Sequence, residues 1–326
     1  MNIIKILKKY DIIKDIVGLE KFNQLLEFIN NLSKSDINFL YNGIEKKLCL
    51  KPLLNNLKYN DLGLYISRCI YSENFINTKF QVYRNENEYF DKYMNDGYLV
   101  LEDFLPENDF FLIENEFNNI IKNINPNTNG KFFLKKIFYN NLDKKLSKNI
   151  INFYNNERLI KLLKLCSFDL DGKNIKNNHR NYLELLSHGE ASKDIQKVWH
   201  VDTFHPTCKW WFYIQDILDK DLGPLEYIKG SHKNSLLKLK HEHQTINNVL
   251  NGKLDCYGTK EGSVRFFNKN TIMNLGYKED DFKKLFYKKN TLIITNNRGI
   301  HRRGHGKIGS KRYSLSSSLR FNIYKK

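Results

Sequence analysis

The chain has 326 residues, of which 53 are basic and 36 acidic, so its formal net charge is +17. This length buries a large core without added staples, and five scattered cysteines with no CxxC spacing argue against a disulfide framework. The basic residues form no run of five or six and no stripe interleaved with aromatics, so a nucleic-acid partner is not indicated.

The first twenty residues, MNIIKILKKYDIIKDIVGLE, predict an amphipathic helix. Charged side chains interrupt every apolar run, so the stretch has neither a signal-peptide core nor an unbroken membrane span. Ile3, Ile6, Leu7 and Tyr10 recur at helical spacing. We therefore expect a cytoplasmic protein with no transmembrane segment.

Residues 1–85 are predicted to form a helical N-terminal extension. Apolar residues follow a helical period, as in Phe22, Leu25 and Ile29, with breaks such as those at Pro52 and Gly63. Because no Gly/Ser-rich or Pro-rich linker follows, we expect the extension to pack on a second domain, residues 86–326.

The second domain is predicted to be mainly β, with flanking helices. GYLVLEDFLPEND, beginning at Gly97, predicts a short strand, a turn at Pro106 and a helix through Phe110–Phe117, and the segment 123–131 predicts a loop. Beyond Asn181 the strand-like segments are YLELLS, CKWWFYIQDI, SVRFF, TLIIT and RYSLSSSLRFNIY. Short strands with no regular helix expected between them favour an antiparallel barrel or sandwich.

The segment WHVDTFH, residues 199–205, predicts part of a metal site. In an extended strand residues i and i+2 point to the same side, so His200 and Asp202 converge. A third ligand must come from elsewhere, and His301 fits better than His305 in its spacing to Arg312. Two histidines and one carboxylate suit a non-haem Fe(II) oxygenase, and the same set also suits a catalytic zinc.

Arg312 distinguishes between an Fe(II) site and a zinc site. Strand alternation puts Arg312, Ser314 and Ser316 on one face of a buried strand, where an unpaired guanidinium is costly. A dicarboxylate cosubstrate would supply the partner, with Ser314 as a further donor, whereas a zinc hydrolase needs no such clamp. An internal ion pair with Asp or Glu is the alternative.

Several segments together resemble the phytanoyl-CoA dioxygenase family of Fe(II)/2-oxoglutarate-dependent oxygenases. The resemblance covers roughly residues 88–324 and lies in FDKYMNDGYLVLEDFLPENDFFLIENEF, HVD at 200–202, CKWWFYIQDI, LGPLEYIKGSHK and IHRRG with KR at 311–312. It implies a double-stranded β-helix (jelly-roll, cupin-like) core. It also implies His200, Asp202 and His301 as Fe(II) ligands, with Arg312 and Ser314 binding 2-oxoglutarate.

The implied reaction uses O2 and 2-oxoglutarate to hydroxylate a small molecule, a polar metabolite, sugar or natural-product-type compound, releasing succinate and CO2. Halogenating relatives carry a small residue where this chain has Asp202, so hydroxylation is favoured. The alternatives are an oxygenase acting on protein or nucleic acid, and a jelly-roll binding protein without turnover. The sequence does not indicate an oligomeric state.

Other residues are expected to lie near the site or to play structural roles. The candidates for substrate contact or for support of the ligands are His205, Trp211, Tyr213 and Arg303. His232 is expected to make structural hydrogen bonds. The remaining histidines are expected in polar, exposed segments: His179, His188, His241 and His243.

Overall fold

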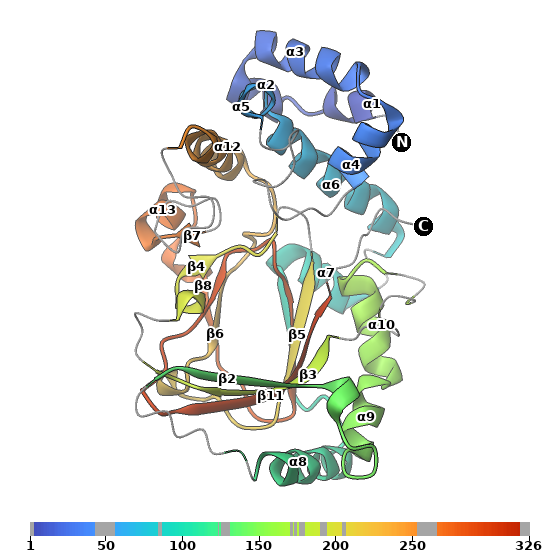
Figure 1. The fold of residues 1–326 in the computed structure, drawn as a ribbon, viewed down its shortest axis with the longest axis vertical. Helices are drawn as coiled ribbons and strands as arrows, with labels where there is room; N and C mark the ends of the chain where they lie inside the picture. The colour runs from blue at the N-terminus through green and yellow to red at the C-terminus, as the bar shows by residue number, and fades with distance from the viewer. Residues whose placement is uncertain are drawn as a thin grey trace.

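The computed structural model describes most of the chain. The described residues are 3–42, 56–83, 87–122, 124, 131–169, 172, 175, 180–189, 194–203, 207–252 and 266–319. Figure 1 shows the N-terminal helices at one end of the molecule, two antiparallel sheets in its middle and helix α8 at the opposite end.

The helices of the described residues are concentrated before residue 170. They are α1 (Ile3–Leu7), α2 (Ile12–Val17), α3 (Leu19–Asn30), α4 (Lys34–Asn42), α5 (Leu57–Asp61), α6 (Leu64–Phe80), α7 (Glu88–Asp96), α8 (Glu107–Ile121), α9 (Lys148–Tyr154), α10 (Glu157–Cys166), α12 (Leu236–Leu250) and α13 (Lys269–Asn274). Short 3-10 turns also occur, for example Gln81–Tyr83 between α6 and α7, and Ile195–Lys197.

The strands form two antiparallel sheets. Their bounds are β1 (Tyr98–Leu101), β2 (Phe133–Phe138), β3 (Asn181–Ser187), β4 (Trp199–His200), β5 (Cys208–Tyr213), β6 (Leu225–Ile228), β7 (Phe266–Phe267), β8 (Phe282–Leu285), β9 (Thr291–Asn296), β10 (His301–Arg303) and β11 (Lys311–Leu319). One sheet has the order β1-β9-β5-β11-β3-β2 and the other β7-β4-β10-β6-β8.

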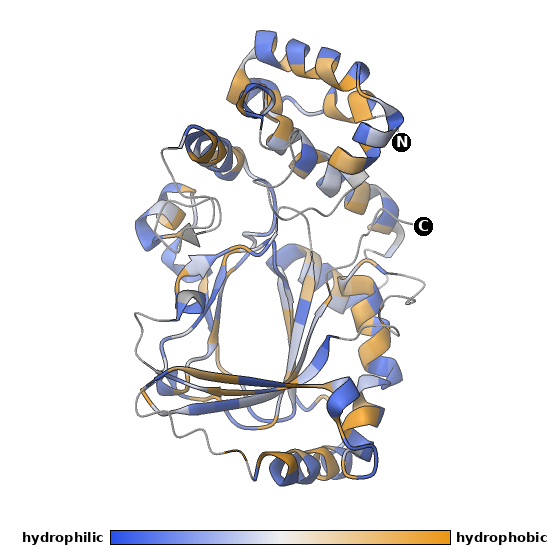
Figure 2. Cartoon of the chain, in the orientation of Figure 1, coloured by the Kyte–Doolittle hydropathy of each residue, from blue (hydrophilic) through white to orange (hydrophobic). Residues whose placement is uncertain are grey.

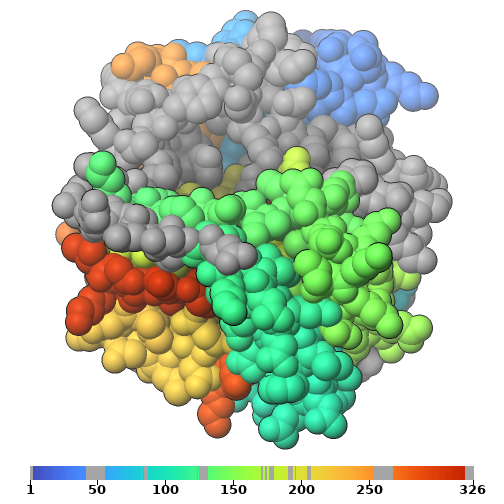
Figure 3. All heavy atoms as spheres, turned by 60° about the horizontal axis from the view of Figure 1, so that its bottom comes forward, coloured from blue at the N-terminus to red at the C-terminus, as the bar shows by residue number. Residues whose placement is uncertain are grey.

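The outer face of the six-stranded sheet is covered by helices. Trp210 and Phe212 of β5 point to this face and pack against α9, where the rings of Phe153 and Phe212 stack with centroids 4.4 Å apart. Helices α7, α8 and α10 contribute to the same apolar cluster. In Figure 3, α8 (teal) and β2 with α9 and α10 (green) lie side by side on the surface.

The inner faces of the two sheets meet in a second apolar cluster. Trp211 and Tyr213, the alternate residues of β5, pack there with Tyr227 of β6 and Leu285 of β8. Side chains alternate along a strand, so the same β5 sequence supplies both the helix-covered face and the interior between the sheets.

The N-terminal helices have an apolar cluster of their own, which α12 completes. Leu239 and Ile246 of α12 are buried in it with residues of α1 to α6. Figure 2 shows the apolar side of α3 (orange) turned toward α1 and α2. The predicted helical character of this region is confirmed for residues 3–42 and 56–83, but the single amphipathic helix expected in the first twenty residues is two helices, α1 and α2. The domain boundary at residue 85 stays a prediction.

The prediction of a mainly β second domain is confirmed only in part. The antiparallel sheets are present, but across the described chain helices hold more residues than strands do. The segment expected to lack regular helices contains α12 and α13. A start signal was present for α12, because the Ser235 side chain accepts a hydrogen bond from the backbone N–H of Lys238 (3.2 Å) at the helix N-terminus.

Candidate metal centre

Two adjacent strands bring the predicted metal ligands together. His200 ends β4 and His301 begins β10, and the two residues are directly opposed in the antiparallel register of these strands. Side chains in such a pair share a face with their Cβ atoms roughly 5 Å apart, and the two imidazole centroids lie 4.5 Å from each other. Asp202, two residues after His200, completes the group.

Backbone hydrogen bonds set the orientation of both imidazoles in the same way. His200 Nδ1 lies 2.7 Å from the carbonyl of Val198, and His301 Nδ1 lies 2.9 Å from the carbonyl of Gly299. Since a carbonyl only accepts, each Nδ1 carries the proton and each Nε2 presents its lone pair. His200 Nε2 is 3.8 Å from Asp202 Oδ1, so one of these lone pairs already lies beside the carboxylate.

Asp202 is held by the turn between β9 and β10. The side-chain amide of Asn297 donates to Asp202 Oδ2 (2.8 Å), and the Asp202 backbone N–H donates to the Asn297 carbonyl (2.9 Å). Asn297 is itself fixed, because the Thr295 hydroxyl donates to its Oδ1 (2.8 Å). Asn297 was not among the site residues predicted from the sequence. Its position after a buried strand and before His301 was the only indication of such a role.

These three residues could hold one divalent metal ion. One ligand atom from each of His200, Asp202 and His301 lies within 4.8 Å of the other two, slightly wider than a single ion with bonds of about 2.1 Å spans. Two imidazole nitrogens and one carboxylate oxygen leave coordination positions open, a donor set that suits Fe(II) and also Zn(II).

The other histidines fall into different environments. His305 is exposed, so the structure brings His301 rather than His305 to the other two ligands, while His205 and His179 lie outside the described residues. His232 Nε2 donates to the carbonyl of Met94 (3.0 Å), the structural role expected of it.

The expectation that His188 and His243 are exposed is wrong, since both are buried. Two glycines make room for the His188 ring. A Cβ added to Gly223 would lie 2.3 Å from the ring, and one added to Gly306 would lie 2.5 Å from it. Burial and the nearby charge of Arg312 lower the pKa of His188 to about 3, so this imidazole is neutral.

Arg312 lies deeper between the sheets, on β11, and is buried. Its Nη1 donates to the Gly223 carbonyl (2.6 Å), and its Nη2 lies 4.0 Å from Glu184 Oε1. Its Nε has no hydrogen-bond partner among the residues that the structure describes. Ser314 shares this face, and its hydroxyl lies 3.0 Å from that of Ser316. The Nε–H of the Arg312 guanidinium therefore remains available as a hydrogen-bond donor, although Glu184 is near.

Further cations surround this part of the interior. Burial opposes ionisation of Glu184, but the charges of Lys209, Arg312 and Arg303 outweigh it and lower the pKa of this carboxyl. Burial also lowers the pKa of Lys209 to about 8, against the opposing charge of Glu184. Arg303 Nη1 donates to Asp194 Oδ2 (2.6 Å). The interior between the sheets thus contains several buried cations, which suits an anionic occupant.

Trp211 and Tyr213 line the same interior but are almost fully buried. The Lys209 ammonium lies 4.6 Å from the centre of the Trp211 ring, and the Tyr213 ring stacks on Tyr287 with centroids 3.9 Å apart. These aromatic rings lie beside the charged groups and lower the local dielectric constant. A lower dielectric constant strengthens the electrostatic interactions there.

Comparisons with known proteins give low similarity. No protein-family model matches the sequence, and no curated protein matches it. The resemblance to the phytanoyl-CoA dioxygenase family therefore stays a prediction. Function has to be inferred from the site residues themselves.

Three solved structures resemble this chain at low sequence identity. The epimerase SnoN, with Fe3+, alpha ketoglutarate and nogalamycin RO, is 14% identical, covering 71% of this chain and 81% of its own, with a TM-score of 0.42. HygX from Streptomyces hygroscopicus, with nickel and 2-oxoglutarate, is 11% identical, with coverages of 71% and 85% and a TM-score of 0.42. The carbocyclase SnoK from nogalamycin biosynthesis is 10% identical, with coverages of 72% and 84% and a TM-score of 0.41.

The described helices include none that combines the length and the apolar character needed to cross a membrane.

Proposed function

We propose that the chain is an Fe(II)- and 2-oxoglutarate-dependent dioxygenase that hydroxylates a small polar metabolite, sugar or natural-product-type compound. The observation that carries this proposal is the convergence of His200, Asp202 and His301, with both histidines presenting Nε2 to one point. The strand orders of the two sheets are compatible with a double-stranded β-helix core spanning residues 86–326.

Arg312 favours Fe(II) with a dicarboxylate over a zinc hydrolase. A buried guanidinium with an unused Nε, next to Lys209 and Arg303, fits the distal carboxylate of 2-oxoglutarate. In this proposal Arg312 binds that carboxylate and Ser314 turns its hydroxyl from Ser316 to the ligand. Zinc hydrolysis of a neutral substrate gives no reason for this concentration of buried positive charge.

The proposed reaction converts substrate C–H, O2 and 2-oxoglutarate into substrate C–OH, succinate and CO2. Fe(II), when bound with 2-oxoglutarate, supplies the O2 chemistry that this conversion needs. The residues of the chain position and protect the reactants. Asn297 engages Asp202 Oδ2 and leaves Oδ1 beside His200, so the carboxylate binds through one oxygen and open positions remain.

Other groups in the interior are assigned to the substrate side. Trp211 and Tyr213 keep water from the reacting centre, and Arg303, anchored by Asp194, offers its remaining donors to a polar substrate. We keep His205 as a candidate for the same side, because the sequence puts it three residues after Asp202. Residues 1–85 are assigned no catalytic role.

Succinate release from 2-oxoglutarate tests the proposal. Protein loaded anaerobically with Fe(II) is exposed to O2 and 2-oxoglutarate, alone and with a panel of polar metabolites. We expect slow uncoupled succinate release that the true substrate accelerates, and loss of succinate release in Asp202→Ala. The matched control is Asp15→Ala, on an exposed position of α2. Activity of Asp202→Ala at the wild-type level would contradict the ligand assignment.

A further inference from the structure

A polar cavity lies beside the turn between β9 and β10, on the side away from Asp202. It has a volume of about 280 Å³ and is enclosed by α6, the end of α7, the turn after β6 and the turn after β9. Asn296 and Arg298 line it, whereas Asn297, between them in sequence, donates to Asp202. The cavity is small for a ligand site, so it suits a small metabolite.

Two opposite charges in this cavity are held apart by one amide. Arg298 Nη2 donates to Asn234 Oδ1, and Asn234 Nδ2 donates to Glu73 Oε2 (2.8 Å). Asn234 thus bridges Arg298 and Glu73, which form no direct ion pair with each other in the part of the chain that the structure describes. Both charged groups keep bonding capacity that Asn234 alone does not use.

The unused donors gather on the Arg298 side. Arg298 is 2% exposed, and its Nη1 has no hydrogen-bond partner among the described residues. Leaving a buried donor of a charged group unpaired costs roughly 1 to 3 kcal/mol or more. Asn296 Oδ1 accepts from the Arg298 backbone N–H (3.1 Å), which leaves the Asn296 amide nitrogen for another acceptor. A carboxylate is the group that two such donors would bind.

Charges of both signs line the cavity, because Arg298 and Lys233 are basic and Glu73 is acidic. Glu242 Oε2 lies 3.4 Å from Arg298 Nη2 and offsets its charge from behind. Lys233 also lines the cavity and is exposed to solvent. A ligand that carries both a carboxylate and an ammonium group matches this arrangement better than a simple anion or cation does.

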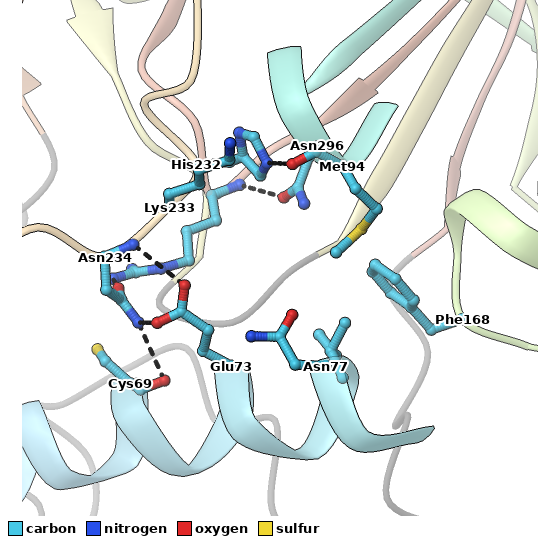
Figure 4. Close-up of a pocket in the computed structure, with 11 residues that line it drawn as sticks. Cys69, Glu73, Asn77, Met94, Phe168, His232, Lys233, Asn234 and Asn296 are labelled. Atoms are coloured by element: carbon cyan, nitrogen blue, oxygen red, sulfur yellow. Dashed lines mark hydrogen bonds between the residues drawn. The ribbon is translucent and has the colours of Figure 1, made fainter. Parts of the chain in front are cut away.

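Part of the remaining wall of the cavity is apolar. Figure 4 shows Glu73 and Asn234 on one side, with Met94 and Phe168 across from them. Ile76 of α6 also lines the cavity and is buried. An apolar substituent of a few carbons would remove this wall from water, at about 25 cal/mol for each Å² buried.

We propose that this cavity binds a free α-amino acid with an apolar side chain. The α-carboxylate accepts from the Arg298 guanidinium and the Asn296 amide, the ammonium group donates to the Glu73 carboxylate, and the side chain packs on Met94 and Phe168. The site is built from the N-terminal helical region together with the turn that supports Asp202. It does not depend on the proposed oxygenase activity.

Calorimetric titration of the full-length, metal-free protein tests this site on the wild-type chain. The probes are L-leucine, L-methionine and L-phenylalanine. Two truncated leucine analogues serve as controls, 4-methylpentanoate without the ammonium group and isoamylamine without the carboxylate. We expect saturable one-to-one binding of at least one amino acid, and at least tenfold weaker binding of both analogues. No saturable binding of any amino acid, or equal binding of 4-methylpentanoate and L-leucine, would overturn the proposal.

A pair of variants locates the site. Glu73→Gln removes the charge that faces the ammonium group and is expected to weaken amino-acid binding at least tenfold. Glu27→Gln, an exposed position of α3, is the matched control and is expected to bind like the wild type. Wild-type affinity in Glu73→Gln would overturn the assignment. If Glu73→Gln unfolds, the analogue comparison on the wild-type chain still decides the question.

Discussion

Asn297 decides how the Asp202 carboxylate is presented. Its amide donates to Asp202 Oδ2 and its own Oδ1 is fixed by Thr295, so the carboxylate has one settled orientation. We predict that Asn297→Leu, which has a similar volume but no donor, weakens Fe(II) binding about 10- to 100-fold, the usual effect of losing a group that orients a metal ligand. Anaerobic competition with a chelator measures this affinity.

The control for this prediction is Asn23→Leu, on an exposed position of α3, which should bind Fe(II) like the wild type. Equal affinity in Asn297→Leu and the wild type would show that Asn297 does not position Asp202.

His232 makes folding sensitive to acid. Burial lowers the pKa of His232 to about 3 from an ordinary value of 6.5, so as pH falls from 6.5 toward 3 the unfolded chain takes up a proton that the folded chain refuses. Stability is complete above pH 6.5 and is lost through that window. We predict that the wild type loses about 2 kcal/mol more than His232→Gln between pH 7 and pH 5.

Urea denaturation of both proteins at several pH values measures this difference. Glutamine is chosen because its amide can still donate to the Met94 carbonyl that His232 Nε2 now contacts. Parallel pH profiles for the wild type and His232→Gln would contradict the prediction.

At the scale of single residues, the sequence predicts what local geometry determines. The i, i+2 spacing of His200 and Asp202 requires only a strand, and the placement of His301 beside them follows the expected spacing to Arg312. The Asn297 contact and the burial of His188 could not be predicted, because both depend on residues that meet only after the sheets have formed.

At the scale of elements, the turn between β9 and β10 is packed without spare volume. A Cβ added to Gly299 would lie 1.8 Å from the Tyr227 hydroxyl, which donates to the Asn296 carbonyl (2.8 Å). We predict that Gly299→Ala displaces this turn, lowers stability by about 1 to 3 kcal/mol and weakens metal binding.

Thermal unfolding and Fe(II) titration report the two effects of Gly299→Ala. Shortening the opposing side chain in Gly299→Ala/Tyr227→Leu should recover part of the metal affinity relative to Gly299→Ala. Full metal affinity in Gly299→Ala would show that the turn does not position the ligands.

Helix α12 joins the N-terminal helices to the remainder of the chain. Leu239 is fully buried in the N-terminal cluster, whereas Leu236 of the same helix is 43% exposed. We predict that Leu239→Ala costs about 2 to 5 kcal/mol, the range for a buried leucine, and raises hydrogen exchange in residues 3–42. Residues 291–296 of β9, outside this cluster, should keep their protection.

Leu236→Ala is the matched control and should leave exchange unchanged. If Leu239→Ala leaves exchange in residues 3–42 unchanged, α12 does not anchor the N-terminal helices.

Sequence patterns predicted some strands well but missed helix α12. The alternation of β11 is visible in the sequence, with Ser317 as an exception, because this strand separates an apolar helix-packed face from a more polar interior. Helix α12 was missed because its sequence, LLKLKHEHQTINNVL, is mostly polar and buries polar side chains such as Lys238 and Glu242. Those side chains find partners across the fold, which one segment cannot show.

At the scale of the whole molecule, the basic side chains lie in two environments, the surface and the interior between the sheets. Many lysines are exposed, but Lys197, Lys209, Arg303 and Arg312 lie in the interior between the sheets or close to it. Composition alone could not reveal this internal cluster of basic side chains. The antiparallel sheets were predictable from the sequence, while the helical share of the molecule was underestimated.

The central claim is that His200, Asp202 and His301 bind one ferrous ion. Anomalous diffraction from crystals grown anaerobically with Fe(II) tests it most directly. We predict a single strong peak about 2.1 Å from His200 Nε2, His301 Nε2 and Asp202 Oδ1, and no such peak in crystals of Asp202→Ala. A map without density at this position, or with iron bound only at other residues, would contradict the account.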